Sequence, residues 1–157
     1  MNHRQLSMVG HGALIMVIGL LSGFGLVMSL VGGFEIFPGT ILEFELPGDS
    51  GAWARAHAGG ITNALMVIAG AWLVGALALP ETTARRVCWM LIGSGYANTL
   101  FYYGAIFSPT RALTMGDNRF GETNIAGMLG YLPALVFAVI AIIAFGIIAR
   151  HAFTQNK

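Results

Sequence analysis

Charged residues are scarce in this 157-residue chain and are missing from most of its length. Asp, Glu, Lys and Arg make up 10% of the residues, whereas a soluble domain carries about 25%. Four uninterrupted runs contain none of them: residues 5–34, 56–80, 87–110 and 123–149. This composition excludes a soluble enzyme, a disordered protein and a nucleic-acid binder, and the net charge of +1 offers no attraction for an anionic polymer.

Cysteine is nearly absent as well, and the one residue, Cys88, cannot form an intrachain disulfide. No Ser-His-Asp or Cys-His pair is evident. The uncharged runs offer no carboxylate, ammonium or guanidinium at membrane depth, which argues against a proton pump and a sodium-coupled transporter.

Apolar residues are what the chain has in abundance, at 56% of the total. Each uncharged run exceeds the roughly 20 residues that cross a bilayer core as a helix. We therefore predict an all-α, integral membrane four-helix bundle that forms a single domain over residues 1–157. The expected spans are about 8–31, 56–79, 84–107 and 124–149, and Thr82 or Thr83 is expected to cap the third helix.

The placement of Lys and Arg predicts the orientation of such a bundle. With four spans, the two termini and the 81–86 loop lie on one side, and the basic residues on that side are Arg4, Arg85, Arg86, Arg150 and Lys157. The opposite side carries only Arg55, Arg111 and Arg119. By the positive-inside rule we expect a multi-pass membrane protein with both termini in the cytoplasm.

Two stretches predict details of the packing. Gly19 and Gly23 form a pair of small residues that permits close helix approach, either within the bundle or between subunits. Residues 32–55 contain three turn signals but are too apolar for a free loop. We expect this segment to fold over the outer mouth of the bundle as a cap or short hairpin.

Polar residues at membrane depth are the candidates for chemistry, and His57 has two interpretations. It is either an interfacial histidine bonded to backbone or water, or the axial ligand of a haem. Trp53 precedes it by one turn, Gly59-Gly60 leave room for a flat group, and Arg55 offers a cation for a haem propionate.

A second group of polar residues is expected at similar depth. Asn63 lies about 9 Å deeper than His57 along its helix. Asn98 and Tyr102 are four residues apart, so they share one helix face. These three side chains either line an outer-leaflet pocket of amides and a phenol, or have structural roles only. In the second case the Asn side chains make hydrogen bonds between helices and the Tyr belongs to the aromatic belt. His11 and Tyr96 are interpreted as structural.

Several of these stretches resemble the styrene oxide isomerase family. The matching segments are Gly10-His11-Gly12, VGGFEIFPG at 31–39, EFELPG at 43–48, WARAHAGGITN at 53–63, YANTLFYYGAIFSPTRALTMG at 96–116 and NRFG at 118–121. The resemblance implies a small four-helix membrane protein that forms a homotrimer and binds haem b between subunits. It further implies that His57 is the axial iron ligand and that Asn63 and Tyr102 line the substrate pocket, while Arg55 as a propionate partner is inferred from its position alone.

The hypothesis that follows is an isomerase of small apolar aryl epoxides. Ferric haem would act as a Lewis acid, the benzylic carbon–oxygen bond would break, and a 1,2-hydride shift would give an arylacetaldehyde. The resemblance also implies a place in styrene degradation, after a styrene-oxidising monooxygenase. The alternatives are a non-catalytic membrane haem protein that carries electrons or acts as a sensor subunit, and a purely structural membrane subunit.

Overall fold

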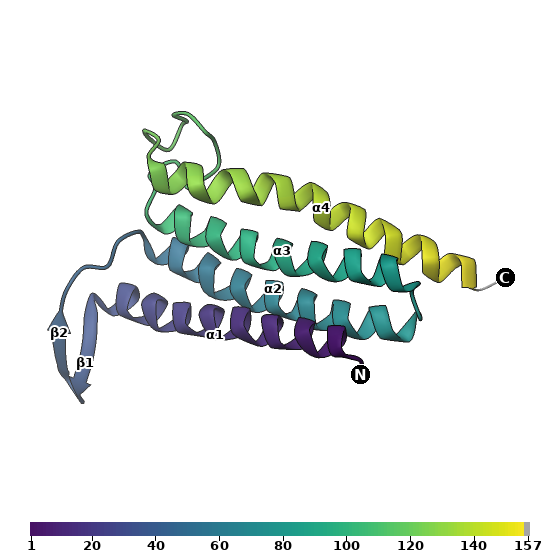
Figure 1. Cartoon of the computed structure of the whole chain (residues 1–157). Coiled ribbons are helices and arrows are strands. Elements are labelled where there is room, and N and C mark those ends of the chain that lie inside the picture. The colour runs from purple at the N-terminus through teal and green to yellow at the C-terminus, as the bar shows by residue number, and fades with distance from the viewer. Residues whose placement is uncertain (156–157) are drawn as a thin grey trace.

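The computed structural model describes residues 1–155 and consists of four long helices and one short hairpin. In chain order these are α1 (His3–Val31), β1 (Gly33–Phe37), β2 (Thr40–Glu43), α2 (Ser50–Ala76), α3 (Glu81–Ile106) and α4 (Ile125–Gln155). The helices lie side by side, and the start of α1 and the end of α4 lie at the same end of the bundle (Figure 1). The predicted four-helix bundle is therefore confirmed, while Lys157 lies outside the described residues.

Three of the four described helices, α1, α2 and α4, are long and apolar enough to cross a membrane. Their outward faces carry large apolar side chains, such as Phe24 and Ile142, which are 62% and 71% exposed. Exposed apolar faces of this extent suit contact with lipid. Helix α3 has 26 residues but carries Glu81, Arg85 and Arg86 in its first turns, so its role as a fourth span remains a prediction.

The helix starts follow local capping rather than the edges of the apolar runs. Helix α1 begins earlier than expected because Asn2 and Gln5 form a reciprocal capping box. Helix α2 begins at Ser50 because the Asp49 side chain accepts from the Ala52 amide. The prediction that Thr82 or Thr83 caps α3 is wrong, because the helix starts at Glu81, directly after Pro80, and no side chain caps it.

The core holds α1, α2 and α3 together through fully buried residues such as Met8, Ile15 and Leu91. At the crossing of α1 and α2, a Cβ on Gly60 would lie 2.5 Å from the Cα of Gly19. The two backbones therefore touch here, which confirms the interpretation of Gly19 as an in-bundle contact residue.

This crossing predicts a large loss of stability for Gly60→Ala. The new methyl group has no space, so α1 and α2 must separate, at a cost of about 1–3 kcal/mol or more. Gly10→Ala is the matched control, because nothing lies within 4 Å of a Cβ at that helical position. Thermal unfolding of both variants in detergent is the measurement, and equal melting temperatures would contradict the close crossing.

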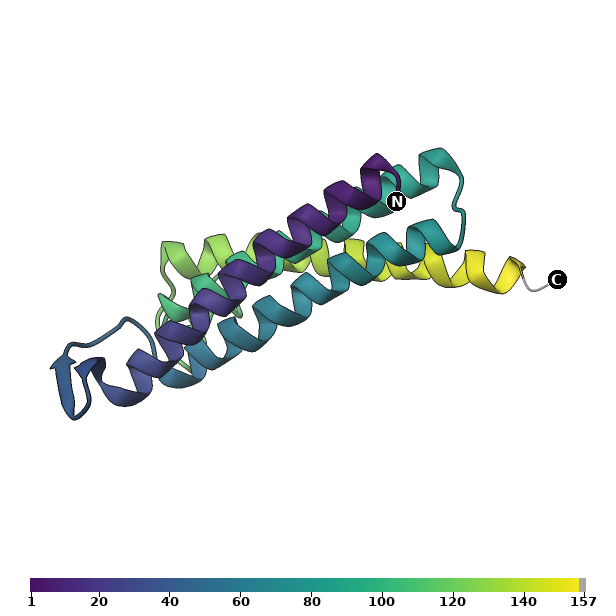
Figure 2. The ribbon, with the colours of Figure 1, turned by 90° about the horizontal axis from the view of Figure 1, so that it is seen from below.

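The segment after α1 forms the predicted hairpin, but it does not cap the bundle. Strands β1 and β2 pair antiparallel around Gly39, and the Phe44 amide extends the pairing to the Gly32 carbonyl. The hairpin projects beyond the end of α1 (Figures 1 and 2), and its residues are exposed except Gly33. The pairing runs back to Gly32, which ends α1 in the left-handed conformation, so the hairpin continues outward from the end of α1 instead of folding over the helices.

Candidate functional site

His57 lies on α2 and faces α1. Its Nδ1 is 2.9 Å from the carbonyl oxygen of Gly19, and a Cβ on Gly23 would lie 2.9 Å from the imidazole ring. A carbonyl oxygen can only accept, so Nδ1 carries the proton and Nε2 keeps its lone pair. A hydrogen bond of this kind fixes the tautomer and orientation of a metal-binding histidine.

Asn63 lies deeper on α2 and is 7% exposed. Its Oδ1 accepts from Nδ2 of Asn98 on α3 at 3.3 Å. Its own Nδ2 is buried and has no hydrogen-bond partner within the described part of the chain. A buried donor without a partner costs about 1–3 kcal/mol, so a ligand that accepts this hydrogen bond would recover that cost.

Tyr102 lies one helical turn from this amide pair, where α3 crosses Gly59. A Cβ on Gly59 would overlap the Tyr102 ring. The prediction that Gly59-Gly60 leave room for a flat cofactor is therefore wrong: Gly59 makes space for Tyr102, and Gly60 makes space for α1. The Tyr102 ring also packs edge-to-face on Phe101, with 5.4 Å between the ring centroids.

His11, Tyr96 and Tyr103 have hydrogen-bond partners within the bundle. Nδ1 of His11 is 3.0 Å from the Tyr96 hydroxyl, and the Tyr103 hydroxyl is 2.9 Å from Oγ of Ser22. The structural interpretation of His11 and Tyr96 is thereby supported.

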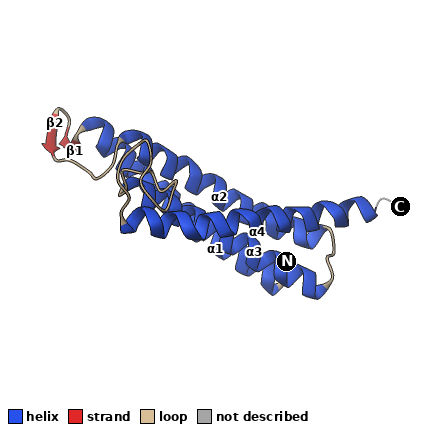
Figure 3. Cartoon of the chain, turned by 90° about the horizontal axis from the view of Figure 1, so that it is seen from above, coloured by secondary structure: helices blue, strands red, loops and turns tan. Residues whose placement is uncertain are grey.

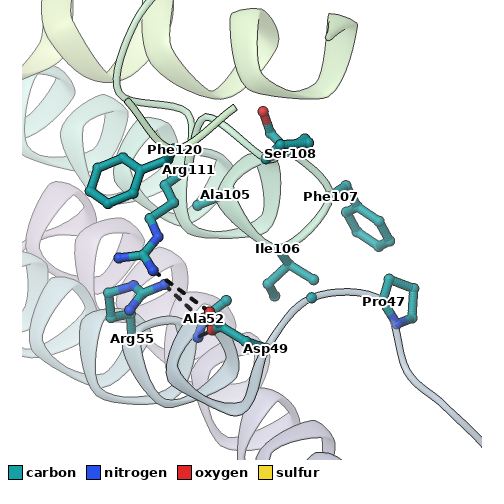
Figure 4. A pocket seen from close by; sticks show the side chains of 12 residues that line it. Pro47, Asp49, Ala52, Arg55, Ala105, Ile106, Phe107, Ser108, Arg111 and Phe120 are labelled. Carbon is teal, nitrogen blue, oxygen red and sulfur yellow. Dashed lines mark hydrogen bonds and ion pairs between the residues drawn. The ribbon is translucent and has the colours of Figure 1, made fainter. Parts of the chain in front are cut away.

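Arg55 lies in the first turns of α2 beside a polar pocket of about 510 Å³ (Figure 4). Asp49 lies between two guanidinium groups, at 3.8 Å from Arg55 and 3.9 Å from Arg111. Arg111 also stacks on the Phe120 ring at 4.4 Å. Two cations share one carboxylate, so the cluster retains one positive charge for a further carboxylate.

Asp49 and Arg111 were missed by the sequence reasoning. They are separated by the length of α2 and α3, so only the fold brings them together. One sequence feature could have pointed to Arg111. It is the first charged residue after the uncharged run 87–110, and it lies in the 96–116 segment that resembles the family.

The candidate residues occupy two edges of one exposed face of α2. Ala58 and Thr62 are exposed along the middle of that face. At about 100° per residue, His57 lies at the edge next to α1, whereas Gly59 and Asn63 lie at the edge next to α3. Arg55 and Tyr102 line the same small pocket of about 150 Å³. The structure thus brings Arg55, Asn63 and Tyr102 to one edge and leaves His57 at the other.

Comparison with known proteins decides the family. The family model described as styrene oxide isomerase matches residues 4–153. A styrene-oxide isomerase of Pseudomonas fluorescens is 45% identical over 145 residues, which cover 92% of this chain and 86% of the relative. This chain belongs to the styrene oxide isomerase family. Family membership identifies it as an isomerase and excludes the purely structural subunit considered above.

Among residues 1–155, no three His, Cys, Asp or Glu side chains lie close enough to hold a metal ion by themselves.

Proposed function

We propose that this chain converts aryl epoxides of the styrene oxide type to arylacetaldehydes, with haem b held by His57. The observation that carries the proposal is a pair of groups without partners among the described residues: the His57 imidazole, whose Nε2 lone pair is free to bind a metal, and the buried Nδ2 of Asn63, which has no acceptor. The family and the identity to a named styrene-oxide isomerase support the choice of substrate.

The residues present fit a haem with a single axial histidine. The Gly19 carbonyl presets the tautomer of His57, Gly23 gives its ring space, and exposed Ala58 and Thr62 leave an unobstructed face beside it. Arg55, assisted by Arg111, would hold a propionate. The chemistry that ferric haem supplies when bound is Lewis acidity toward the epoxide oxygen.

The side chains of the second edge would orient the substrate. Nδ2 of Asn63 would donate to the epoxide oxygen as negative charge develops on it. The Tyr102 hydroxyl, which has no hydrogen-bond partner among the described residues, would act on the same oxygen while its ring contacts the aryl group. No acid or base is required, because a 1,2-hydride shift moves hydrogen between neighbouring carbons of one molecule.

The proposal includes a homotrimer with haem between subunits, and the separation of the two edges supports a site shared by neighbouring copies. His57 and the Asn63–Tyr102 edge face away from each other across the exposed face of α2, so one chain does not surround a single flat group with both. In a ring of copies, the α1 edge of one subunit would meet the α3 edge of the next. The site would then be complete only in the assembly.

The membrane arrangement is part of the proposal. We infer that all four helices, including α3, cross the bacterial inner membrane and that both termini lie in the cytoplasm, because Lys and Arg are more frequent at that end. Burial in the bilayer would keep water from opening the epoxide to a diol.

The test is product analysis with styrene oxide carrying deuterium at both positions of its terminal carbon. A hydride shift predicts phenylacetaldehyde with one deuterium on the aldehyde carbon and one on the benzylic carbon at early times. Diol formation, loss of one deuterium to water at early times, or absence of turnover would each overturn the proposal.

A further inference from the structure

An apolar pocket of about 210 Å³ lies between α3, the loop that follows it and α4. Its wall includes Phe101, Leu113, Ala134 and Ala138, and Asn98 and Tyr131 supply its only polar side chains. None of the residues assigned to the site above, apart from Asn98, belongs to it. A cavity of this composition suits a flat apolar group that makes one or two hydrogen bonds.

The apolar pocket adjoins the small pocket beside Tyr102. Phe101 and Leu113 line both, so these two side chains form the partition between them. Across this partition, Asn98 donates to Asn63, which links the apolar pocket to the amide pair of the proposed site. A ligand in the apolar pocket would therefore be separated from Tyr102 by two side chains only.

The apolar pocket opens sideways, away from the ends of the bundle. Ala138 is exposed on α4, and the neighbouring Val139 is 54% exposed on the same apolar surface. Asn98 lies eight residues before the end of α3, about 12 Å along the helix. In the proposed membrane arrangement, an opening at this depth faces hydrocarbon, whereas the polar pocket at Asp49 faces water.

The loop that supplies Leu113 is held in a strained conformation. Arg111 and Ala112 have φ values of 57° and 52°, which side chains rarely adopt. The hydrogen bond between Ser108 and Thr110 at 2.8 Å and burial of Ala112 hold the loop in place. Strain of this kind persists where the surrounding structure enforces it, and here it places Leu113 at the partition.

We propose that the apolar pocket is the lateral entry site for the substrate, which takes the aryl ring of the epoxide from the bilayer and passes it to Tyr102 between Phe101 and Leu113. This inference rests on the proposed function. It assigns a substrate-binding role to Ala134 and Ala138 and a gating role to Phe101 and Leu113.

The kinetic test fills the pocket from α4. Ala134→Trp should raise KM for styrene oxide about tenfold or more and leave kcat unchanged, because it removes binding that precedes chemistry. Val136→Trp is the matched control, since Val136 is 49% exposed on α4 and does not line the pocket. Equal kinetics for the two variants would overturn the inference. If Ala134→Trp does not yield a folded bundle, Ala138→Phe serves instead, with the same expectations.

A labelling experiment separates this inference from the proposed function. The parent protein is irradiated with an aryl trifluoromethyl diazirine, and the modified peptides are located by mass spectrometry. Labels on the 98–113 and 131–138 segments that styrene oxide competes away support the entry site, even if no aldehyde forms. Turnover with labels elsewhere, or labels that styrene oxide does not displace, would overturn the entry site and leave the proposed function standing.

Discussion

His57→Ala is expected to yield protein without a Soret band and without isomerase activity. The His57 imidazole contacts Gly19 and Gly23 of α1, and its Nε2 has no partner among the described residues. If His57 is the sole protein ligand of the proposed haem, its loss should release the haem, and activity should fall to the rate of the uncatalysed reaction in buffer. The measurement is the absorption spectrum of the detergent-purified variant, read beside its turnover of styrene oxide.

Two further variants make this result specific to the ligand. His11→Ala removes a histidine of the same helix bundle that bonds to Tyr96, and it should keep both haem and activity. Gly23→Ala keeps His57 but displaces its ring, since the new Cβ would lie 2.9 Å from it. Disturbing the orientation of a metal ligand costs about 10–100-fold in affinity. Haem titration of Gly23→Ala should therefore give a larger Kd than that of the parent.

Chemical rescue tests the same role of His57. Imidazole added to His57→Ala can occupy the space that the side chain leaves, so it should restore part of the Soret band in the presence of haem. Full activity of His57→Ala without haem would refute the role of His57 and the Lewis-acid mechanism together. Loss of haem in His11→Ala to the same extent would show that the bundle merely loosens.

The helices were predictable because they depend on composition that can be read along the chain. An uncharged run longer than a bilayer core has few alternatives to a helix, and all four expected helices are present. Pairs at helical spacing were predictable too: Asn98 and Tyr102 do face α2 together, through Asn63 and Gly59. The helix starts were less predictable, because Asn2 and Asp49 act through local hydrogen bonds outside the apolar runs.

Contacts between distant segments could not be read in this way. Gly59 and Gly60 look alike in the sequence, but one accepts the Tyr102 ring and the other accepts the backbone of Gly19. The cluster of Asp49, Arg55 and Arg111 likewise depends on where the α3–α4 loop returns, and Figure 3 shows that loop at the same end as the hairpin. Sequence reasoning finds the residue types that carry chemistry, whereas the fold decides which of them meet.

Tyr102→Phe is expected to retain haem and lose most of its turnover. The substitution removes one hydroxyl and keeps the ring that packs on Gly59 and Phe101. If the hydroxyl stabilises charge on the epoxide oxygen, its removal should lower kcat about 100-fold, as for the loss of one donor to a developing oxyanion. The Soret band should stay as intense as in the parent, so the measurement is kcat per bound haem.

Tyr103→Phe is the matched control for this prediction, because it makes the same chemical change on the next residue of α3. The Tyr103 hydroxyl is bonded to Ser22 at 2.9 Å. Its loss should lower stability by about 1 kcal/mol and leave kcat unchanged.

Gly59→Ala tests the ring separately, since its methyl group would displace Tyr102 without removing the hydroxyl. If Gly59→Ala and Tyr102→Phe both lower kcat while Tyr103→Phe keeps the parental kcat, the reaction needs both the position and the hydroxyl of Tyr102. A parental kcat for Tyr102→Phe would show that Tyr102 is only a packing residue.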